Sequence, residues 1–153
     1  MMLILMFVGL SVALIALGSQ AYRSITQTAE ENAQKRTAVG YVINRVHAFD
    51  AKGAVRVEEV ELEGQLTDVL TLTEQIDGEC YETRLFCADG SLREQFTHVQ
   101  TPLETAYDGE KIVELAEFEV EISGSMIQVT FTHPDGATDT VHVALRSGGE
   151  GQK

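Results

Sequence analysis

The chain has 153 residues, which gives room for about one domain and an appendage. Its formal net charge is −13, but residues 1–49 hold four basic and two acidic residues, whereas residues 50–153 hold seven basic and 22 acidic residues. An acidic domain repels the phosphates of nucleic acids and anionic membrane surfaces, so the composition argues against nucleic acid as a partner.

The first predicted element is an apolar helix over residues 1–22. No charged residue occurs before Arg23. A bilayer core about 30 Å thick needs roughly 20 mostly apolar residues in a helix, so the length predicts a transmembrane segment. A cleaved secretion signal would have a basic leader and an apolar core of about 7–15 residues. We therefore expect the segment to be retained, although Ser19-Gln20-Ala21 has the small residues of a cleavage site.

The second predicted element is an amphipathic continuation of the same helix over residues 23–52. There is no proline between Gln20 and Phe49, and apolar residues recur at steps that keep one face of a helix apolar. We expect the helix to end where Gly53 can adopt the left-handed conformation. The apolar face is expected to pack on a sheet through Val39, Ile43 and Val46.

After Gly53 the period changes from helical to alternating. β-branched or aromatic residues alternate with polar ones in "VRVEEVELE", "DVLTLTEQ", "CYETRLFCA", "SLREQFTHV", "AEFEVEIS", "MIQVTFTH" and "TDTVHVAL". Asp-Gly pairs at 77–78, 89–90 and 135–136 match tight hairpins. Such short connections leave no room for crossover helices, so the strands are expected to form an antiparallel meander. The stretch "QTPLETAYDGEKIVEL" reads as an irregular excursion.

The predicted fold class is therefore α+β. A long N-terminal helix, transmembrane in its first half and amphipathic in its second, packs on an antiparallel β meander in a head domain over residues 53–146, and residues 147–153 form a flexible tail. The face of the sheet that meets the helix is expected to bury Leu70, Leu72, Tyr81, Leu85, Phe118, Val120, Ile127, Val129, Phe131, Val141 and Val143.

The candidate chemistry is sparse. Cys80 and Cys87 would lie about 23 Å apart in one extended strand, and a disulfide needs α-carbons within about 7 Å. We expect no bridge between them, while free thiols and an intermolecular bridge both stay open. The four histidines and the acidic run "VEEVELEGQLTD" lack the spacings of zinc and calcium sites, and no nucleophile or phosphate-binding motif is present. We therefore expect a protein that is not an enzyme and has no cofactor or metal.

Within the apolar helix, small residues recur at steps of four and three, a pattern that lets helices approach closely. The candidate residues for membrane and filament contacts are Leu3, Leu5, Phe7, Gly9, Ala13 and Ala16.

The order of an apolar helix, the amphipathic "RTAVGYVINRVHAFDAKGA" and the strands of "CYETRLFCADGSLREQF" resembles the minor pseudopilins of type II secretion and competence systems. It is most similar to an uncharacterised, pilin-like, membrane-anchored family of Gram-positive anaerobes. "ADGSLRE", from Ala88 to Glu94, matches the glycine turn followed by leucine and arginine that many pseudopilins have.

The resemblance implies a subunit of a type IV pilus, competence or type II secretion-like filament, with the bilayer, other pilin-like subunits and assembly platform proteins as partners. An assembly ATPase would drive extraction of the helix, which is then buried against neighbouring helices. The subunit would be a single-pass cytoplasmic membrane protein with an extracytoplasmic head, at the cell surface once in the filament. The alternative is a single-pass anchored β domain that binds a partner or ligand without polymerising.

The sequence departs from the pilin pattern in three respects. The fifth position, a glutamate in most mature pilins, is Leu5, and the basic leader and glycine cleavage site of prepilins are not in this sequence. Arg23, Lys35 and Arg36 would favour a cytoplasmic C-terminal side by the positive-inside rule. A start within a longer gene is one hypothesis that accounts for the leader and the orientation.

Overall fold

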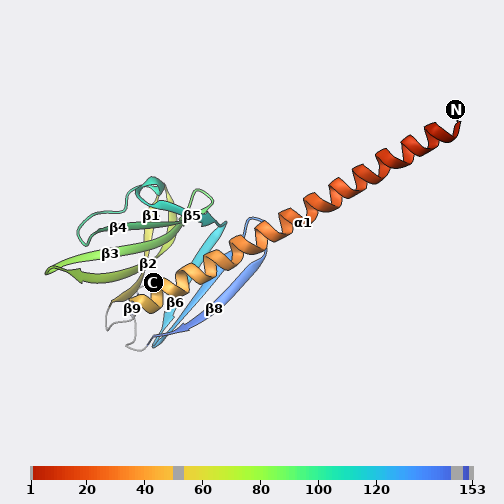
Figure 1. The fold of residues 1–153 in the computed structure, drawn as a ribbon. Coiled ribbons are helices and arrows are strands. Elements are labelled where there is room, and N and C mark those ends of the chain that lie inside the picture. The colour runs from red at the N-terminus through yellow and green to blue at the C-terminus, as the bar shows by residue number, and fades with distance from the viewer. Residues whose placement is uncertain (1, 50–53, 146–149, 152–153) are drawn as a thin grey trace. The chain divides into compact units, whose positions relative to one another are not determined.

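The computed structural model describes residues 2–49, 54–145 and 150–151 (Figure 1). Its elements are α1 (Met2–Ala48), β1 (Val55–Leu62), β2 (Gln65–Ile76), β3 (Glu79–Ala88), β4 (Ser91–His98), the 3-10 turn η1 (Ala106–Asp108), β5 (Glu110–Glu114), β6 (Glu117–Ser123), β7 (Met126–Thr132), β8 (Thr138–Ala144) and β9 (Glu150–Gly151).

The chain divides into two compact units, Met1–Lys35 and Arg36–Lys153. The predicted helix end at Gly53 lies outside the described residues. Most of the predicted tail lies outside them too, and Glu150–Gly151 within it form β9.

The strands form two antiparallel meanders (Figure 1). The first sheet has the order β5-β4-β3-β2-β1, with the two-residue β9 added to β1 in parallel, and the second has the order β6-β7-β8. The predicted α+β class and antiparallel pairing are confirmed.

The prediction of a single sheet is wrong, because the chain leaves the first sheet after β5. Leu115 is completely buried, and its N–H donates to the carbonyl oxygen of Gly90 at 3.1 Å. The N–H of Ala116 then donates to the carbonyl oxygen of Thr132 at 2.8 Å. This corner carries the chain from one sheet to the other within two residues.

Two of the predicted Asp-Gly turns have the backbone that a two-residue hairpin requires. Asp77 and Gly78 have φ values of 52° and 89°, and Asp89 and Gly90 have 50° and 64°, which is the pattern of type I′ turns. Glu63-Gly64 forms a third such turn, with φ values of 52° and 85°. The third turn was not predicted because glutamate is not a typical residue at the first position.

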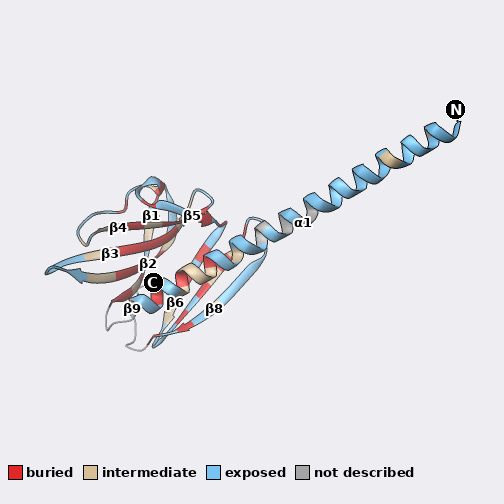
Figure 2. Ribbon diagram, in the orientation of Figure 1, coloured by how far each residue is buried: buried red, intermediate tan, exposed pale blue. Residues whose placement is uncertain are grey.

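The main hydrophobic core of the second unit is built from residues 36–48 of α1 and from both sheets (Figure 2). Nine of the eleven residues predicted for this core are buried. Val141 is half-buried at the edge strand β8 and packs against the core. The prediction that Tyr81 lies in this core is wrong. Its side chain is half-buried, and its ring stacks on Phe96 with centroids 5.4 Å apart near the end of the sheet.

The excursion before β6 covers the other face of the first sheet. We call residues 99–109 the strap. Leu103 of the strap packs with Leu62, Val69 and Phe86 in a second, smaller core. The strap therefore gives β3 two buried faces, where an alternating pattern predicts one.

Candidate functional site

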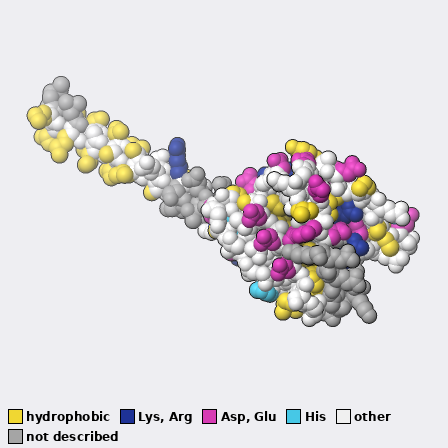
Figure 3. All heavy atoms as spheres, turned by 180° about the vertical axis from the view of Figure 1, so that it is seen from behind, with side chains coloured by type: hydrophobic (Ala, Val, Ile, Leu, Met, Phe, Trp, Pro, Cys, Tyr) yellow, Lys and Arg dark blue, Asp and Glu magenta, His cyan; other side chains and the backbone are white. Residues whose placement is uncertain are grey.

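The apolar segment is the feature that most needs a partner. Residues 2–23 of α1 are long and apolar enough to cross a bilayer, and none of their most apolar window is buried within the chain. The large apolar side chains described between Met2 and Leu17 are 51–88% exposed, and Figure 3 shows them along this part of the helix. Exposed apolar area is unfavourable in water by roughly 25 cal/mol per Å². The segment is therefore a candidate membrane anchor or signal sequence.

The residues predicted for membrane and filament contacts all lie in this segment. Leu3 and Phe7 are 83% and 71% exposed. Gly9, Ala13 and Ala16 are exposed, and a Cβ added to Gly9 would meet no atom within 4 Å. The side chain of Leu5 lies outside the described residues. Within the described part of the chain, nothing covers the small-residue positions.

The end of α1 is fixed to the sheets by an apolar face. Val46 is completely buried, and Val39 and Ile43 are half-buried against the core. Ala38 and Val42 are also completely buried, although they are not among the predicted contact residues. Their spacing of four residues, continued by Val46, is the signal that would have identified the centre of this face.

A polar cluster ties the same helix to β4. The Tyr41 hydroxyl donates to Glu94 Oε2 at 2.6 Å, and Arg45 Nη2 donates to Glu94 Oε1 at 2.5 Å and to the Tyr41 oxygen at 3.1 Å. Burial and the hydrogen bond to Glu94 raise the pKa of Tyr41, and the hydrogen bond with Tyr41 raises the pKa of Arg45. Glu94 is the last residue of the "ADGSLRE" motif on which the resemblance to pseudopilins partly rests. It makes a helix-to-sheet contact that the sequence alone did not reveal.

A second polar cluster lies under the strap. Glu82 is 1% exposed, and its carboxylate accepts hydrogen bonds from Arg56 Nη2 at 2.8 Å and from Arg84 Nη2 at 2.7 Å. Arg84 Nη1 also donates to the carbonyl oxygen of Thr101 at 2.7 Å. Because both oxygens of the buried carboxylate are occupied by guanidinium groups, this cluster holds the strap and offers no free base.

The two cysteines lie in β3, as predicted, and both are free. Cys80 is exposed and Cys87 is half-buried. Burial raises the pKa of Cys87 to about 11, and its Sγ donates to the carbonyl oxygen of Leu115 at 3.3 Å. Since the thiolate is the reactive form, Cys87 is a poor nucleophile.

Three of the histidines have different partners and do not form one site. His133 is 3% exposed and its Nε2 lies 2.9 Å from Asp139 Oδ2, whereas His142 contacts Gln128 on an exposed surface. His98 packs edge-on against Tyr81. Among the described residues, no group of three or more His, Cys, Asp or Glu could hold a metal ion.

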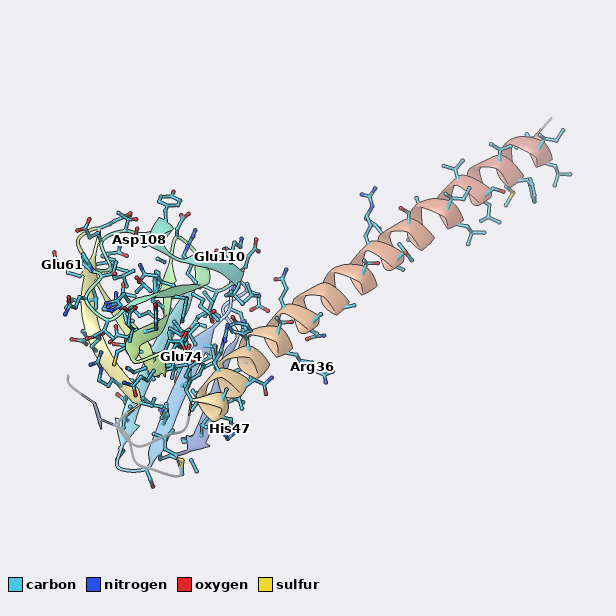
Figure 4. All side chains as sticks on the ribbon, turned by 60° about the vertical axis from the view of Figure 1, so that its left-hand side comes forward. Arg36, His47, Glu61, Glu74, Asp108 and Glu110 are labelled. Atoms are coloured by element: carbon cyan, nitrogen blue, oxygen red, sulfur yellow. The ribbon has the colours of Figure 1, made fainter. Side chains whose placement is uncertain are left out.

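An open groove of about 450 Å³ lies between the β1–β2 hairpin and β6. It is lined by Glu59, Gln65, Leu66, Thr67, Asp68, Cys87, Ala116, Glu117, Phe118 and Glu119. Figure 3 shows acidic side chains gathered on one face of the head, and Figure 4 shows that Glu61, Glu74, Asp108 and Glu110 come from different elements. Asp68 Oδ2 accepts a hydrogen bond from the Val120 N–H at 2.9 Å. The groove therefore lies where the two sheets meet, and carboxylates are among the groups that line it.

A family model described as a domain of unknown function, DUF4860, matches residues 33–134. The chain belongs to this family. The DUF4860 match begins within α1, close to the start of the second compact unit, and ends in the turn after β7. The apolar segment and β8 therefore lie outside the DUF4860 match. No curated protein and no solved structure matches the chain.

Proposed function

We propose that this DUF4860 protein is a non-enzymatic, pilin-like subunit that is held in the membrane by residues 2–22. It assembles into a type IV pilus, competence or type II secretion-like filament through the same helix. The observation that carries this proposal is the uncovered apolar segment at the start of a helix whose last turns pack on an antiparallel β head. Its partners are the bilayer, other pilin-like subunits and assembly platform proteins.

The physical requirement for such a subunit is a second apolar environment. A helix can leave lipid only if another apolar surface receives it, because exposure to water is unfavourable over its whole length. Gly9, Ala13 and Ala16 are small, and small residues let neighbouring helices approach closely. A core of packed helices in a filament meets this requirement.

The head supports an interaction role better than a catalytic one. The buried Glu82 is held by two arginines, the nearly buried Glu94 is held by Tyr41 and Arg45, and Cys87 keeps its proton at neutral pH because its pKa is raised to about 11. These ionisable groups serve to fix the fold. The rival function, an anchored domain that binds a partner without polymerising, shares the anchor and the head and differs only in the fate of the helix.

Cysteine crosslinking in cells separates the two functions. Single cysteines replace Gly9, Ala13 or Ala16 in a chain that also carries Cys80→Ser and Cys87→Ala. A filament subunit gives crosslinked dimers that disappear when the assembly ATPase is deleted. The matched control places the cysteine at Arg36, an exposed position on the second unit that Figure 4 shows pointing away from the sheets. Monomers alone, with and without the ATPase, would contradict the proposal and favour the anchored domain.

A further inference from the structure

The second sheet has an edge, β8, that no strand of the described chain covers, whereas each of the other sheet edges is blocked at least in part. β5 has only five residues, includes the charged Glu110, Lys111 and Glu114, and pairs with β4 through a register shift. Short strands, charges and bulges all discourage further pairing. β9 lies on the outer edge of β1.

The third edge, β6, is capped by a side chain. The N–H of Val120, which points away from β7, donates to Asp68 Oδ2 of the first sheet at 2.9 Å. This N–H of the edge is therefore directed toward the first sheet and not toward a new strand.

β8 differs from these three edges. It pairs with β7 over all seven of its residues without a register shift, and no strand of the described part of the chain pairs with its other side. Its sequence, "TDTVHVA", has no lysine, proline or glycine, and Asp139 is its only acid or base apart from His142. Of the usual protections of an edge strand, only one charged side chain, Asp139, is present.

The direction of the β8 backbone follows from the hydrogen bonds at its two ends. The N–H of Leu145 donates to Ser125 at 2.7 Å, and the carbonyl oxygen of Ala137 accepts from His133 at 2.8 Å. Alternate residues in a strand direct their N–H and C=O to the same side. The odd-numbered residues of β8 thus face β7, and the residues whose N–H and C=O face the open edge are Thr138, Thr140, His142 and Ala144.

We propose that β8 is a docking edge at which an extended segment of a partner protein adds as a fourth strand of the second sheet. The partner segment has apolar residues at alternate positions and basic flanks. An apolar side chain beside Val141, which is half-buried against the core, would extend that core. Basic flanks are favoured because residues 50–153 carry 22 acidic and seven basic residues.

A second copy of the chain is the less favourable occupant. Two such acidic heads repel one another. Antiparallel pairing of β8 with itself also needs a twofold axis perpendicular to the sheet, which reverses the direction of residues 36–48 in one copy. This second reason rests on the proposed membrane anchor, because two chains anchored in one membrane leave it in the same direction.

The test uses the full chain in detergent micelles and a labelled nine-residue peptide, Lys-Val-Thr-Val-Thr-Val-Thr-Val-Lys, as the probe. The control peptide has proline at its third and sixth positions, which removes donors from both of its edges. Thr140→Pro removes an edge N–H of β8 without touching the ladder to β7, and Thr140→Ala is its matched control because it keeps the N–H. Both variants lose the contact between the hydroxyls of Thr130 and Thr140.

We expect the probe to bind the wild type and Thr140→Ala alike, and at least tenfold more weakly to Thr140→Pro. Hydrogen exchange of the wild type should show that the probe slows the amides of Thr138, Thr140 and His142, a readout that holds even if Thr140→Pro fails to fold. Equal binding of the control peptide, no binding of the probe, or a β8-dependent dimer without the probe would each overturn the proposal. Because the assay needs no filament, its failure leaves the crosslinking test of the proposed function unaffected.

Discussion

Cys80 and Cys87 share one strand but differ in burial. Because burial raises the pKa of Cys87 to about 11, almost none of it is thiolate at pH 8, and the group is also half-buried. We expect iodoacetamide to modify Cys80 at least tenfold faster than Cys87 in the folded chain, and both equally in denaturant. Mass spectrometry of Cys80→Ser and Cys87→Ser checks this, and fast modification in the Cys80→Ser chain would contradict it.

The hydroxyl of Tyr41 links α1 to β4. Tyr41→Phe removes its hydrogen bond to the Glu94 carboxylate, and bonds to charged groups contribute about 1.5–3 kcal/mol. Since Arg45 still pairs with Glu94 in the variant, we expect the free energy of unfolding to fall by about 1.5 kcal/mol in urea titrations. Tyr107→Phe, at a 76% exposed side chain, is the control and should have no effect. An unchanged Tyr41→Phe would mean that this contact adds nothing to stability.

The same hydroxyl gives a pH dependence with a defined sign. The pKa of Tyr41 is raised in the folded chain by burial and by Glu94, so the unfolded chain releases this proton at a lower pH than the folded chain does. The stability that the protonated hydroxyl contributes is therefore complete below about pH 10 and is lost as the pH rises further. The difference in unfolding free energy between wild type and Tyr41→Phe should be constant from pH 7 to 9 and should shrink above pH 10.

At the scale of single elements, two glycines should respond to alanine in opposite directions. A Cβ on Gly109 would lie 2.9 Å from Phe86 Cζ and 3.2 Å from Arg93 Cβ, so Gly109→Ala forces the strap away from the sheet and should cost about 1–3 kcal/mol. A Cβ on Gly40 meets nothing within 4 Å, so Gly40→Ala should stabilise α1 by up to about 1 kcal/mol. Thermal unfolding measures the change in stability of each variant. If both variants are more stable than the wild type, or both less stable, the prediction is wrong.

The elements that sequence predicts well are those whose pattern is local. The alternation in "CYETRLFCA" places β3, and Asp77-Gly78 and Asp89-Gly90 place its two turns, because period and turn chemistry act over a few residues. β5 was missed because its five residues follow a proline, a glycine and several charges. The division into two sheets depends on Leu115 entering a core formed by distant strands, which no local pattern reports.

The candidate contact residues show the same limit. Apolar periodicity indicates that the end of α1 faces a sheet, and it selects Val39, Ile43 and Val46. Periodicity does not show that Ala38 and Val42 lie at the centre of the contact. Which side of the helix is most deeply buried also depends on where the sheets lie. The pairing of Tyr41 with Glu94, 53 positions apart in sequence, likewise exists only in the folded head.

At the scale of the whole chain, the two compact units need different solvents. The first exposes an uncharged apolar helix up to Arg23, which is stable only in lipid or against other apolar helices. The second buries most of its apolar side chains in its own cores and carries most of the acidic residues on its surface, which suits water. With the apolar segment as a retained anchor, as we propose, both environments are present at a membrane or in an assembly that replaces the membrane.

This division predicts what charges do in each unit. An arginine at the centre of a spanning helix costs about 2.5–3.5 kcal/mol on insertion scales, so Leu10→Arg combined with Leu14→Arg should cost about 6 kcal/mol and move the chain out of the integral membrane fraction. The control variant carries Leu66→Arg and Ile76→Arg at head positions that are 73% and 40% exposed, and it should stay in the membrane. Alkaline carbonate extraction followed by sedimentation distinguishes the two. If the variant with two charged residues in the helix still resists extraction, the apolar segment is not what holds the chain in the membrane, and the filament proposal loses its starting state.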